Sequence, residues 1–373
     1  MEKILTIVIP TYNMQDYLRR CLDSLIVPEE QMQLLEVLVV NDGSKDNSSA
    51  IAHEYQDKYP GTFRVIDKEN GNYGSCVNRG LKEATGKYIK ILDADDYYDT
   101  VNLKLFIRRL NEIDADAILS CHSVYVNDIK KETIRFRKYK DGQIVCVEKE
   151  LPSYFTMDNI AYKSQIFDNI DYKQTEGISY TDQEWIFYPM EKVKTLCYFD
   201  LDIYQYMTGH AGQTMEMKTY YGRISQVEII VVRMLEYLIS NQNLHPLKRE
   251  YFNRVVKGQM DAIYRAELLI NKTFNLDLLL KIEKLWKSYN PTIYTSFGGL
   301  LINKYFPIRY VYYWRKKNRR YGNYKRKILV DVSFVVEKIR RAARSSSVGE
   351  SYFHLKCIIF MLFLFLVGIG PTG

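Results

Sequence analysis

A group of carboxylates that follows an expected strand is the first feature of this sequence that could carry out chemistry. Asp93, Ala94, Asp95 and Asp96 come directly after the apolar run 88–92. Alternate carboxylates at the end of a strand can reach one cation together, and hard oxygen ligands suit Mg²⁺ or Mn²⁺. Acidic loops after strands also occur without a metal, so this group by itself leaves both interpretations open.

A second acidic group lies among aromatic residues at 180–185, where the sequence reads YTDQEW. In a partly apolar site a carboxylate has a raised pKa and can serve as a general base, which makes Asp182 a candidate. The same residues suit the start of a helix, with Thr181 or Asp182 as N-cap and Glu184 in the first turn. The two interpretations are compatible, because a base at the start of a helix is rigidly placed.

Two further polar stretches have a structural and a functional interpretation. The residue types at 41–44 (NDGS) are typical of a tight turn, yet Asp42 could instead accept hydrogen bonds from a uracil or a ribose. The glycine-containing stretch 70–74 precedes an expected helix and could bring backbone close to a phosphate. The sequence lacks the dinucleotide fingerprint, the P-loop and the Gly-x-Ser-x-Gly motif, which argues against those classes of enzyme.

Strand-like and helix-like stretches alternate over the first hundred residues and would position these groups. We expect strands at 4–10, 34–40, 63–67 and 88–92, and helices at 16–26, 48–59 and 73–84. Such alternation predicts parallel βαβ units in an α/β layer architecture, and ligands of these sheets sit beyond the carboxyl ends of the strands. The polar clusters at 11–13, 41–44 and 93–96 all follow such strands, so we expect them to line one site.

The ordered set of motifs resembles the opening of family 2 glycosyltransferases of the GT-A fold. The matching stretches are TIVIPTYN at 6–13, VVNDGSKDNS at 39–48, residues 70–80, ATGKY at 84–88, LDADD at 92–96, and Thr181-Asp182 where that family has its Glu-Asp pair. The resemblance covers roughly residues 1–210. It implies a mostly parallel central sheet with an antiparallel element, flanked by helices, and an enzyme that inverts the anomeric carbon of a transferred sugar.

Matching positions imply a role for individual residues. The implied donor-binding residues are Pro10, Thr11, Tyr12, Asn13, Asp42, Asn78, Arg79, Asp93 and Ala94. The implied ligands of a divalent cation are Asp95, Asp93 and His210, and the implied catalytic base is Asp182. The chain departs from the pattern at 76–78, where the family often has Ala-Arg-Asn, so an Arg that contacts the diphosphate is missing or is replaced by Arg79.

The charge is concentrated near the end of the chain. The net charge is +7, but residues 304–344 contain fourteen Lys or Arg and only two acidic residues. Aromatic residues alternate with the basic ones, and apolar residues at 328–339 follow a helical spacing, which predicts binding to an anionic membrane surface. Nucleic acid is the rival partner, although no recognised nucleic-acid module accompanies the patch.

An unbroken apolar run of thirteen residues at 357–369 follows the basic segment. A spanning helix needs about 17 to 25 residues, so we interpret the run as an interfacial or re-entrant membrane anchor, with a short span or a buried terminal helix as alternatives. We therefore expect four regions: a GT-A domain at 1–210, a helical domain at 211–303, a basic amphipathic segment at 304–344 and a tail at 345–373 that carries the anchor.

The expected function is synthesis of a bacterial surface polysaccharide from a nucleotide sugar, with a UDP-sugar as the expected donor and a saccharide or lipid-linked acceptor. Transfer to a lipid phosphate or a protein side chain is an alternative, as is a non-catalytic membrane-bound scaffold. The six scattered cysteines form no metal or redox motif, and the N-terminal residues lack the features of a signal peptide. We therefore expect a cytoplasmic protein held at the inner face of the membrane.

Overall fold

The computed structural model describes residues 2–168, 170–209, 217–271, 275–298, 300–301 and 308–316. His210, most of the basic segment and the apolar run at 357–369 lie outside the described residues. The chain divides into two compact units, of which the N-terminal unit comprises 1–216 and 240–257, and the helical unit comprises 217–239 and 258 onward. The region expected to be one helical domain at 211–303 is thus shared between the two units.

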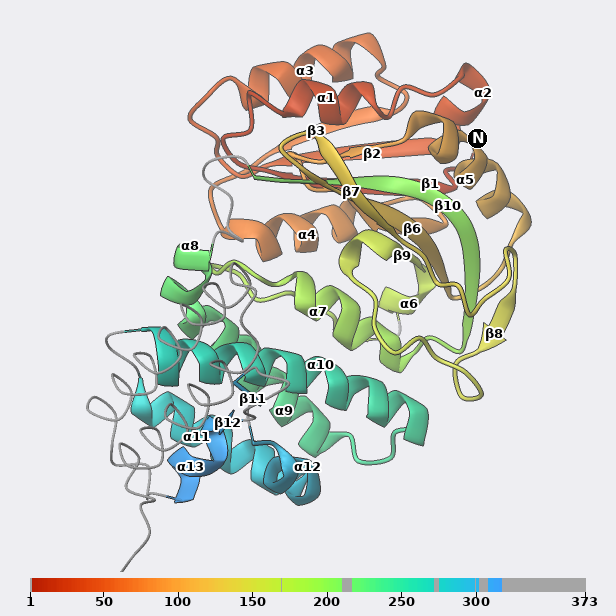
Figure 1. Ribbon diagram of the computed structural model, residues 1–373. Helices are drawn as coiled ribbons and strands as arrows, with labels where there is room; N and C mark the ends of the chain where they lie inside the picture. Colours follow the sequence, from red (N-terminus) through yellow and green to blue (C-terminus); the bar gives the residue numbers. More distant parts are fainter. Residues whose placement is uncertain are drawn as a thin grey trace, which may run out of the picture. The chain divides into compact units, whose positions relative to one another are not determined.

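The N-terminal unit is built on one twisted sheet that is parallel at one end and mixed at the other (Figure 1). The parallel strands are β1 (Leu5–Thr11), β2 (Leu35–Asn41), β3 (Phe63–Asp67) and β4 (Tyr88–Ile91), in the order β3-β2-β1-β4. Every residue of β1 and β2 is buried, as expected for strands covered by helices on both faces. The predicted α/β architecture is therefore confirmed.

The antiparallel element enters next to β4. Strand β9 (Ile160–Lys163) is antiparallel to β4 and to β6 (Ala117–Val126), and β6 runs parallel to the long strand β10 (Thr195–Thr208). The remaining strands of the sheet are short: β5 (Tyr97–Tyr98), β7 (Ile129–Ile134) and β8 (Ile144–Cys146).

Helices cover both faces of the parallel strands (Figure 1). Helices α1 (Leu18–Asp23) and α3 (Ser48–Lys58) lie on one face, and α4 (Asn72–Glu83) lies on the other. Helix α4 comes very close to β1 at Gly80, where an added Cβ would stand 2.3 Å from a methyl carbon of Val8. A glycine is needed at this point because any side chain would push the helix, and the loop before it, away from the sheet.

The other helices of the N-terminal unit are short, apart from α5. They are α2 (Glu29–Met32), α5 (Thr100–Glu112), η1 (Met157–Asn159), α6 (Gln165–Asp168), α7 (Asp182–Phe187) and η2 (Tyr188–Glu191). Within this unit the hydroxyl group of Tyr251, from the start of α10 (Pro246–Arg265), donates to the carbonyl oxygen of Ile186 at 2.8 Å. This contact attaches the residues that follow Asp182 to a second helix.

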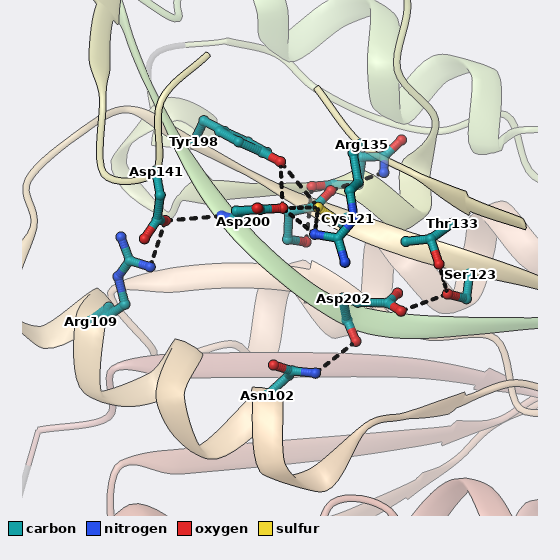
Figure 2. A network of polar contacts seen from close by, with 12 residues as sticks. Asn102, Arg109, Cys121, Ser123, Thr133, Arg135, Asp141, Tyr198, Asp200 and Asp202 are labelled. Carbon is teal, nitrogen blue, oxygen red and sulfur yellow. Dashed lines mark hydrogen bonds and ion pairs between the residues drawn. The ribbon is translucent and has the colours of Figure 1, made fainter. Parts of the chain in front are cut away.

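A polar network holds an irregular stretch of β10 against β6 and β7 (Figure 2). The pairing of β10 with β6 shifts register between Tyr198 and Asp202. Asp200, within this irregular stretch, forms an ion pair with Arg135 and accepts a hydrogen bond from the Tyr198 hydroxyl at 2.9 Å. Asp202 accepts a hydrogen bond from Ser123 at 2.6 Å. These acidic residues are therefore engaged by neighbours in the network.

The helical unit contains α8 (Met217–Gly222), α9 (Ile224–Ser240), a π-helical turn (Ala266–Ile270), α11 (Leu276–Tyr289), α12 (Pro291–Ser296), α13 (Tyr310–Lys316) and the strand pair Leu300–Leu301 and Ile308–Arg309. A buried ion pair lies inside it. Arg315 is 2.7 Å from Glu283 and donates to the carbonyl oxygens of Tyr294 and Phe297 at 2.5 and 3.0 Å. Arg315, one of the basic residues of the segment 304–344, is thus neutralised by Glu283 within the helical unit. No helix in the described ranges is long and apolar enough to cross a membrane.

Candidate active site

Two carboxylates of the acidic loop at 93–96, those of Asp96 and Asp93, have different partners. Asp96 is 1% exposed, and its two oxygens accept hydrogen bonds from the Tyr204 hydroxyl at 2.7 Å and the Met207 amide at 2.6 Å. It therefore attaches the loop to the end of β10. Asp93 instead accepts a hydrogen bond from the Tyr73 hydroxyl at 2.8 Å, from the first turn of α4.

The carboxyl group of Asp93 is surrounded by protein, although part of the residue reaches the surface. Its removal from water raises its pKa, and the nearby carboxylates of Asp95, Asp158 and Asp182 raise it further. Tyr73 experiences the same carboxylates, since burial followed by the charges of Asp93, Asp182 and Asp158 raises the pKa of its phenol. The charge of Asp182, from the second acidic group singled out in the sequence, therefore acts on Asp93 and on the tyrosine that binds it.

The residues at this site suit a divalent cation. Repulsion among partly buried carboxylates disfavours their ionised forms, and a bound cation would reverse that effect. Asp93 and Asp95 supply hard oxygen ligands. Within the part of the chain that the structure describes, no group of three or more His, Cys, Asp or Glu side chains is arranged to hold a metal, and His210 lies outside that part.

Asp182 is the first residue of α7, and the residue before the helix is Thr181. The side chain of Thr181 does not cap the helix as the sequence suggested, because it donates instead to Gln174 Oε1 at 3.0 Å. Gln183 Nε2 donates to Asp182 at 2.9 Å. Burial raises the pKa of Asp182, the hydrogen bond from Gln183 opposes this shift, and the charge of Asp158 adds to it. A carboxylate with a raised pKa is suited to accept a proton.

Glu184, in the same helix, serves the structure of the site. It is fully buried, and its carboxylate accepts hydrogen bonds from the backbone amide and the hydroxyl of Thr175, at 2.6 and 2.9 Å. These bonds hold the segment before α7 against the first turn of that helix. Of the two acidic residues at 180–185, Asp182 is the one whose pKa is raised by the charge of Asp158.

Asn78 was expected to contact the donor, but its amide group contacts the segment before Asp182. Its Oδ1 accepts a hydrogen bond from the Gln174 amide at 2.8 Å, and its Nδ2 donates to the Gln174 carbonyl at 3.0 Å and to Glu176 at 2.9 Å. Asn78 thus links helix α4 to the segment that carries the candidate base.

Arg79 lies on the exposed side of α4. It forms an ion pair with Glu83 at 2.9 Å, and the same carboxylate is 2.7 Å from Arg64. The structure does not bring Arg79 together with Asp93 and Asp182. Arg79 therefore lies at the surface beside Glu83, whereas its neighbour Asn78 contacts the Gln174 segment.

The expected nucleoside-binding residues lie at the carboxyl ends of β1 and β2. Pro10 pairs in register with Val40, and Thr11 with Asn41. Pro10, Thr11 and Ala94 are buried, whereas Tyr12, which is 45% exposed, and Asn13 are open to solvent.

The loops that follow the two strands are cross-linked by polar contacts. Asn13 has a φ of +55°, donates from its backbone amide to Ser44 at 3.0 Å and accepts from the Lys45 amide at 2.8 Å. Asp42 is 2% exposed, and one of its oxygens is 2.5 Å from Lys68 Nζ and 2.9 Å from the Gly71 amide. Asn13 and Asp42 therefore shape this end of the site through bonds to neighbouring loops.

Sequence reasoning missed four residues that surround the carboxylates. Tyr73 donates a hydrogen bond to Asp93, and the charge of Asp158 acts on Asp93 and Asp182. Lys90 donates to the backbone carbonyl of Asp158, and His122 Nε2 is 3.9 Å from its carboxylate. Lys90 left a signal, because it is a charged residue inside the apolar run 88–92. The other three left none, because nothing in their local sequence distinguishes them from ordinary loop or strand residues.

Comparison with known proteins gives one family. Residues 6–172 match the model described as "Glycosyl transferase family 2". An uncharacterized glycosyltransferase of Mycoplasma genitalium is 36% identical over 143 residues, which are 38% of this chain and 47% of that protein. The minor teichoic acid biosynthesis protein GgaB of Bacillus subtilis is 33% identical over 150 residues, which are 39% of this chain and 16% of GgaB.

A solved structure supports the fold. The structure of TarS 1-349 from S. aureus, in complex with UDP-GlcNAc, matches with a TM-score of 0.61 and 17% identity, over 78% of this chain and 82% of that one. At this identity the likeness concerns the fold alone. This chain spans about half the length of the first curated relatives that it matches, at 47% and 48%.

Proposed function

From the match of residues 6–172 to glycosyltransferase family 2, we propose that this chain is an inverting glycosyltransferase of cell-surface polysaccharide synthesis. It would move a sugar from a nucleoside diphosphate donor to a saccharide or lipid-linked acceptor. The proposal rests on the hydrogen bond from Tyr73 to Asp93 and on the charge of Asp182, which acts on both groups, because transfer requires a group that stabilises the leaving diphosphate and a base opposite to it.

Asp182 is the proposed base. It takes the proton of the acceptor hydroxyl while the hydroxyl oxygen forms a bond to the anomeric carbon, and the bond from that carbon to the diphosphate oxygen breaks. One displacement at the anomeric carbon inverts its configuration. A raised pKa improves Asp182 as a proton acceptor as long as the group is ionised at the working pH.

Asp95 and Asp93 would hold a divalent cation, Mn²⁺ or Mg²⁺, and His210 is proposed as a further ligand. When bound, the cation acts as a Lewis acid that stabilises negative charge on the leaving diphosphate. Tyr73 keeps Asp93 oriented through its 2.8 Å hydrogen bond, and Asp96 keeps the loop attached to β10. In this proposal, Asp93 and Asp95 act on the charge of the donor and Asp182 acts on the proton of the acceptor.

A UDP-sugar is the proposed donor. The exposed ring of Tyr12 offers a surface on which a base can stack, and Asp42 and Asn13 shape the loops around it. The TarS structure of similar fold contains UDP-GlcNAc, which makes that donor the first one to test.

We also propose that residues 304–369 hold the protein at the inner face of the membrane. The basis is the excess of Lys and Arg at 304–344 followed by the apolar run at 357–369. Flotation of the full chain with vesicles of anionic and of neutral lipid tests this proposal. Binding to anionic vesicles that survives high salt supports an inserted anchor, release by salt supports a purely electrostatic contact, and no flotation contradicts membrane binding.

The enzymatic proposal is tested by incubating the full chain with a panel of UDP- and GDP-sugars, with and without Mn²⁺ or Mg²⁺, and measuring release of the nucleoside diphosphate. Metal-dependent consumption of one donor, accelerated by a saccharide or lipid-linked acceptor, is the expected result. Acceleration by a lipid phosphate or a protein acceptor would redirect the assignment. If no donor is consumed and no nucleoside diphosphate binds, the proposal is wrong.

A further inference from the structure

Lys90 is a fully buried lysine in the strand that leads to the acidic loop. It lies in β4 between Ile89 and Ile91, and its exposed fraction is 0%. Its ammonium group donates to the carbonyl oxygen of Asp158 at 2.5 Å, and it is 3.5 Å from the carbonyl oxygen of Ile160. Burial lowers the pKa of Lys90 to about 7, against the opposing effect of Asp158.

The turn that accepts these bonds is η1, whose conformation is determined by several further contacts. Thr156 and Asn159 form a reciprocal capping box around it. Asn159 Nδ2 is 2.8 Å from His122 Nδ1 and donates to the Ser120 carbonyl at 3.0 Å. His122 and Asn159 are 6% and 1% exposed, so η1 is attached to β6 through buried polar groups.

The turn connects Lys90 with the carboxylates of the site. The Asp158 carboxylate accepts a hydrogen bond from Thr156 at 3.1 Å and is 3.9 Å from His122 Nε2. Its charge raises the pKa of both Asp93 and Asp182, which places it near each of them. Met157, in the same turn, has its sulfur 3.0 Å from the Tyr73 hydroxyl that binds Asp93.

Stability is a poor explanation for this lysine. A buried ammonium loses its hydration, and this cost offsets much of what its bonds to the two carbonyl oxygens contribute to stability. The residues on either side of Lys90 are the β-branched apolar residues that a buried strand favours. The lysine and the turn it holds therefore call for a role in the site.

We propose that Lys90 is a positioning residue of the transfer reaction, which holds η1, and with it the Asp158 carboxylate, at the site formed by Asp93 and Asp182. This inference rests on the proposed function for its kinetic consequence. Its structural consequence, the attachment of η1 to β4, can be measured without any activity. Lys90 touches neither substrate nor reacting atoms in this arrangement, and it acts through the carbonyl oxygens of the turn.

The test compares Lys90→Met with Lys163→Met in the full chain. Lys163 lies in β9 beside β4, and its ammonium group is 2.7 Å from Asp114 near the protein surface, so its variant removes a lysine from the same strand pair away from η1. For Lys90→Met we expect a kcat roughly 10- to 100-fold lower, because misplacement by about 1 Å can have such an effect. The donor KM and the Kd for UDP should stay within about twofold.

Two structural measurements accompany the kinetics. We expect the melting temperature of Lys90→Met to fall modestly, because the buried carbonyl oxygen of Asp158 loses its partner, and amide hydrogen exchange at 157–160 to become faster. Lys163→Met should change neither kcat nor exchange at 157–160. If Lys90 acts by positioning the Asp158 carboxylate, it can contribute little once that carboxylate is gone. Adding Lys90→Met to Asp158→Asn should therefore lower kcat by less than about twofold.

The possible failures are distinguishable. If the unmodified chain consumes no donor, the proposed function is wrong, while the exchange measurement still decides whether Lys90 holds η1. Unchanged kcat, or unchanged exchange at 157–160, in Lys90→Met would overturn the inference. The inference would also be overturned if the fold-losses of kcat in Lys90→Met and Asp158→Asn multiplied in the double variant. A Lys90→Met chain that fails to fold, or one whose kcat falls only together with its melting temperature and UDP affinity, would make Lys90 a structural residue.

Discussion

Asn78 and Gln174 exchange two hydrogen bonds, one from the Gln174 amide at 2.8 Å and one to its carbonyl at 3.0 Å. The side chain of Asn78 thereby pairs with the backbone of a segment 96 positions later, as a neighbouring strand would. The side-chain oxygen of Gln174 also accepts a hydrogen bond from the hydroxyl of Thr181, the residue directly before Asp182. Helix α4, whose first turn carries Tyr73, is thus connected through this pair to the segment that carries the candidate base.

Replacement of Asn78 should affect the reaction more than donor binding. Asn78→Ala removes the bonds to Gln174 and Glu176, and we expect a loss of unfolding free energy of about 1 to 3 kcal/mol together with a kcat about tenfold lower. The Kd for UDP, measured by calorimetry, should change little. Arg79→Ala is the matched control, since it removes an exposed ion pair with Glu83, which contributes little to stability. A large loss of UDP affinity in Asn78→Ala would contradict this role and support direct contact with the donor.

Asp182→Asn should abolish most of the transfer without loss of donor binding. The amide cannot accept the acceptor proton, and general base catalysis typically contributes about 10²- to 10⁴-fold to a rate. Single-turnover transfer from a donor that the chain consumes measures the effect. Asp200→Asn is a suitable control, because it removes a carboxylate of the network in Figure 2 that lies outside the site. Full activity of Asp182→Asn would refute the assignment of the base.

The pH dependence of kcat/KM should reflect the environment of Asp182. Burial raises its pKa above the ordinary 3.8, and the base works only when ionised, so activity should rise with pH through a value above 3.8. A pH–rate profile at saturating divalent cation, restricted to the range in which the chain stays folded, measures this limb. An acidic limb at or below the ordinary value would show that the carboxylate titrating in the reaction is not the one described here.

The stability of the helical unit should fall as the solution becomes alkaline. Glu228 in α9 is 0% exposed, and burial followed by the charge of Glu267 raises its pKa from 4.5 to about 8. Because the folded state holds the proton more tightly, its stabilising contribution is complete below pH 4.5 and is lost as pH rises through about 8. Glu228→Gln should therefore flatten the decline of thermal stability between pH 5 and 9, with Glu236→Gln in the same helix as control. An unchanged decline in Glu228→Gln would contradict the prediction.

The fold could be predicted from short stretches of sequence, because each strand and helix of the parallel half leaves a local pattern. The apolar runs at 4–10 and 34–40 became β1 and β2, and the expected helix at 73–84 became α4. The motifs at strand ends indicated the family, which the match over 6–172 bears out. Strand ends converge at one edge of a parallel sheet, so the position of Asp42 and Asp93 along the chain already implied a common site.

The division of labour among the site residues depended on contacts that no local pattern encodes. Asp93 and Asp96 are three positions apart in one acidic loop, yet one accepts from Tyr73 at the site and the other attaches the loop to β10. Asn78 and Arg79 are neighbours that face the Gln174 segment and Glu83 respectively, because adjacent residues of a helix point in different directions.

The sequence by itself determined the elements, the family and the two acidic groups, because each of these is a property of a few consecutive residues. Only the tertiary structure brought the charge of Asp158 to bear on Asp93 and Asp182. The hydrogen bond from Lys90 to the Asp158 carbonyl likewise joins β4 to a turn 68 positions away. Burial in that assembly shifts the pKa of Lys90, Asp93 and Asp182, and burial is decided by everything that packs around a side chain. The different roles of Asp93 and Asp96 likewise follow from which residues pack around each of them.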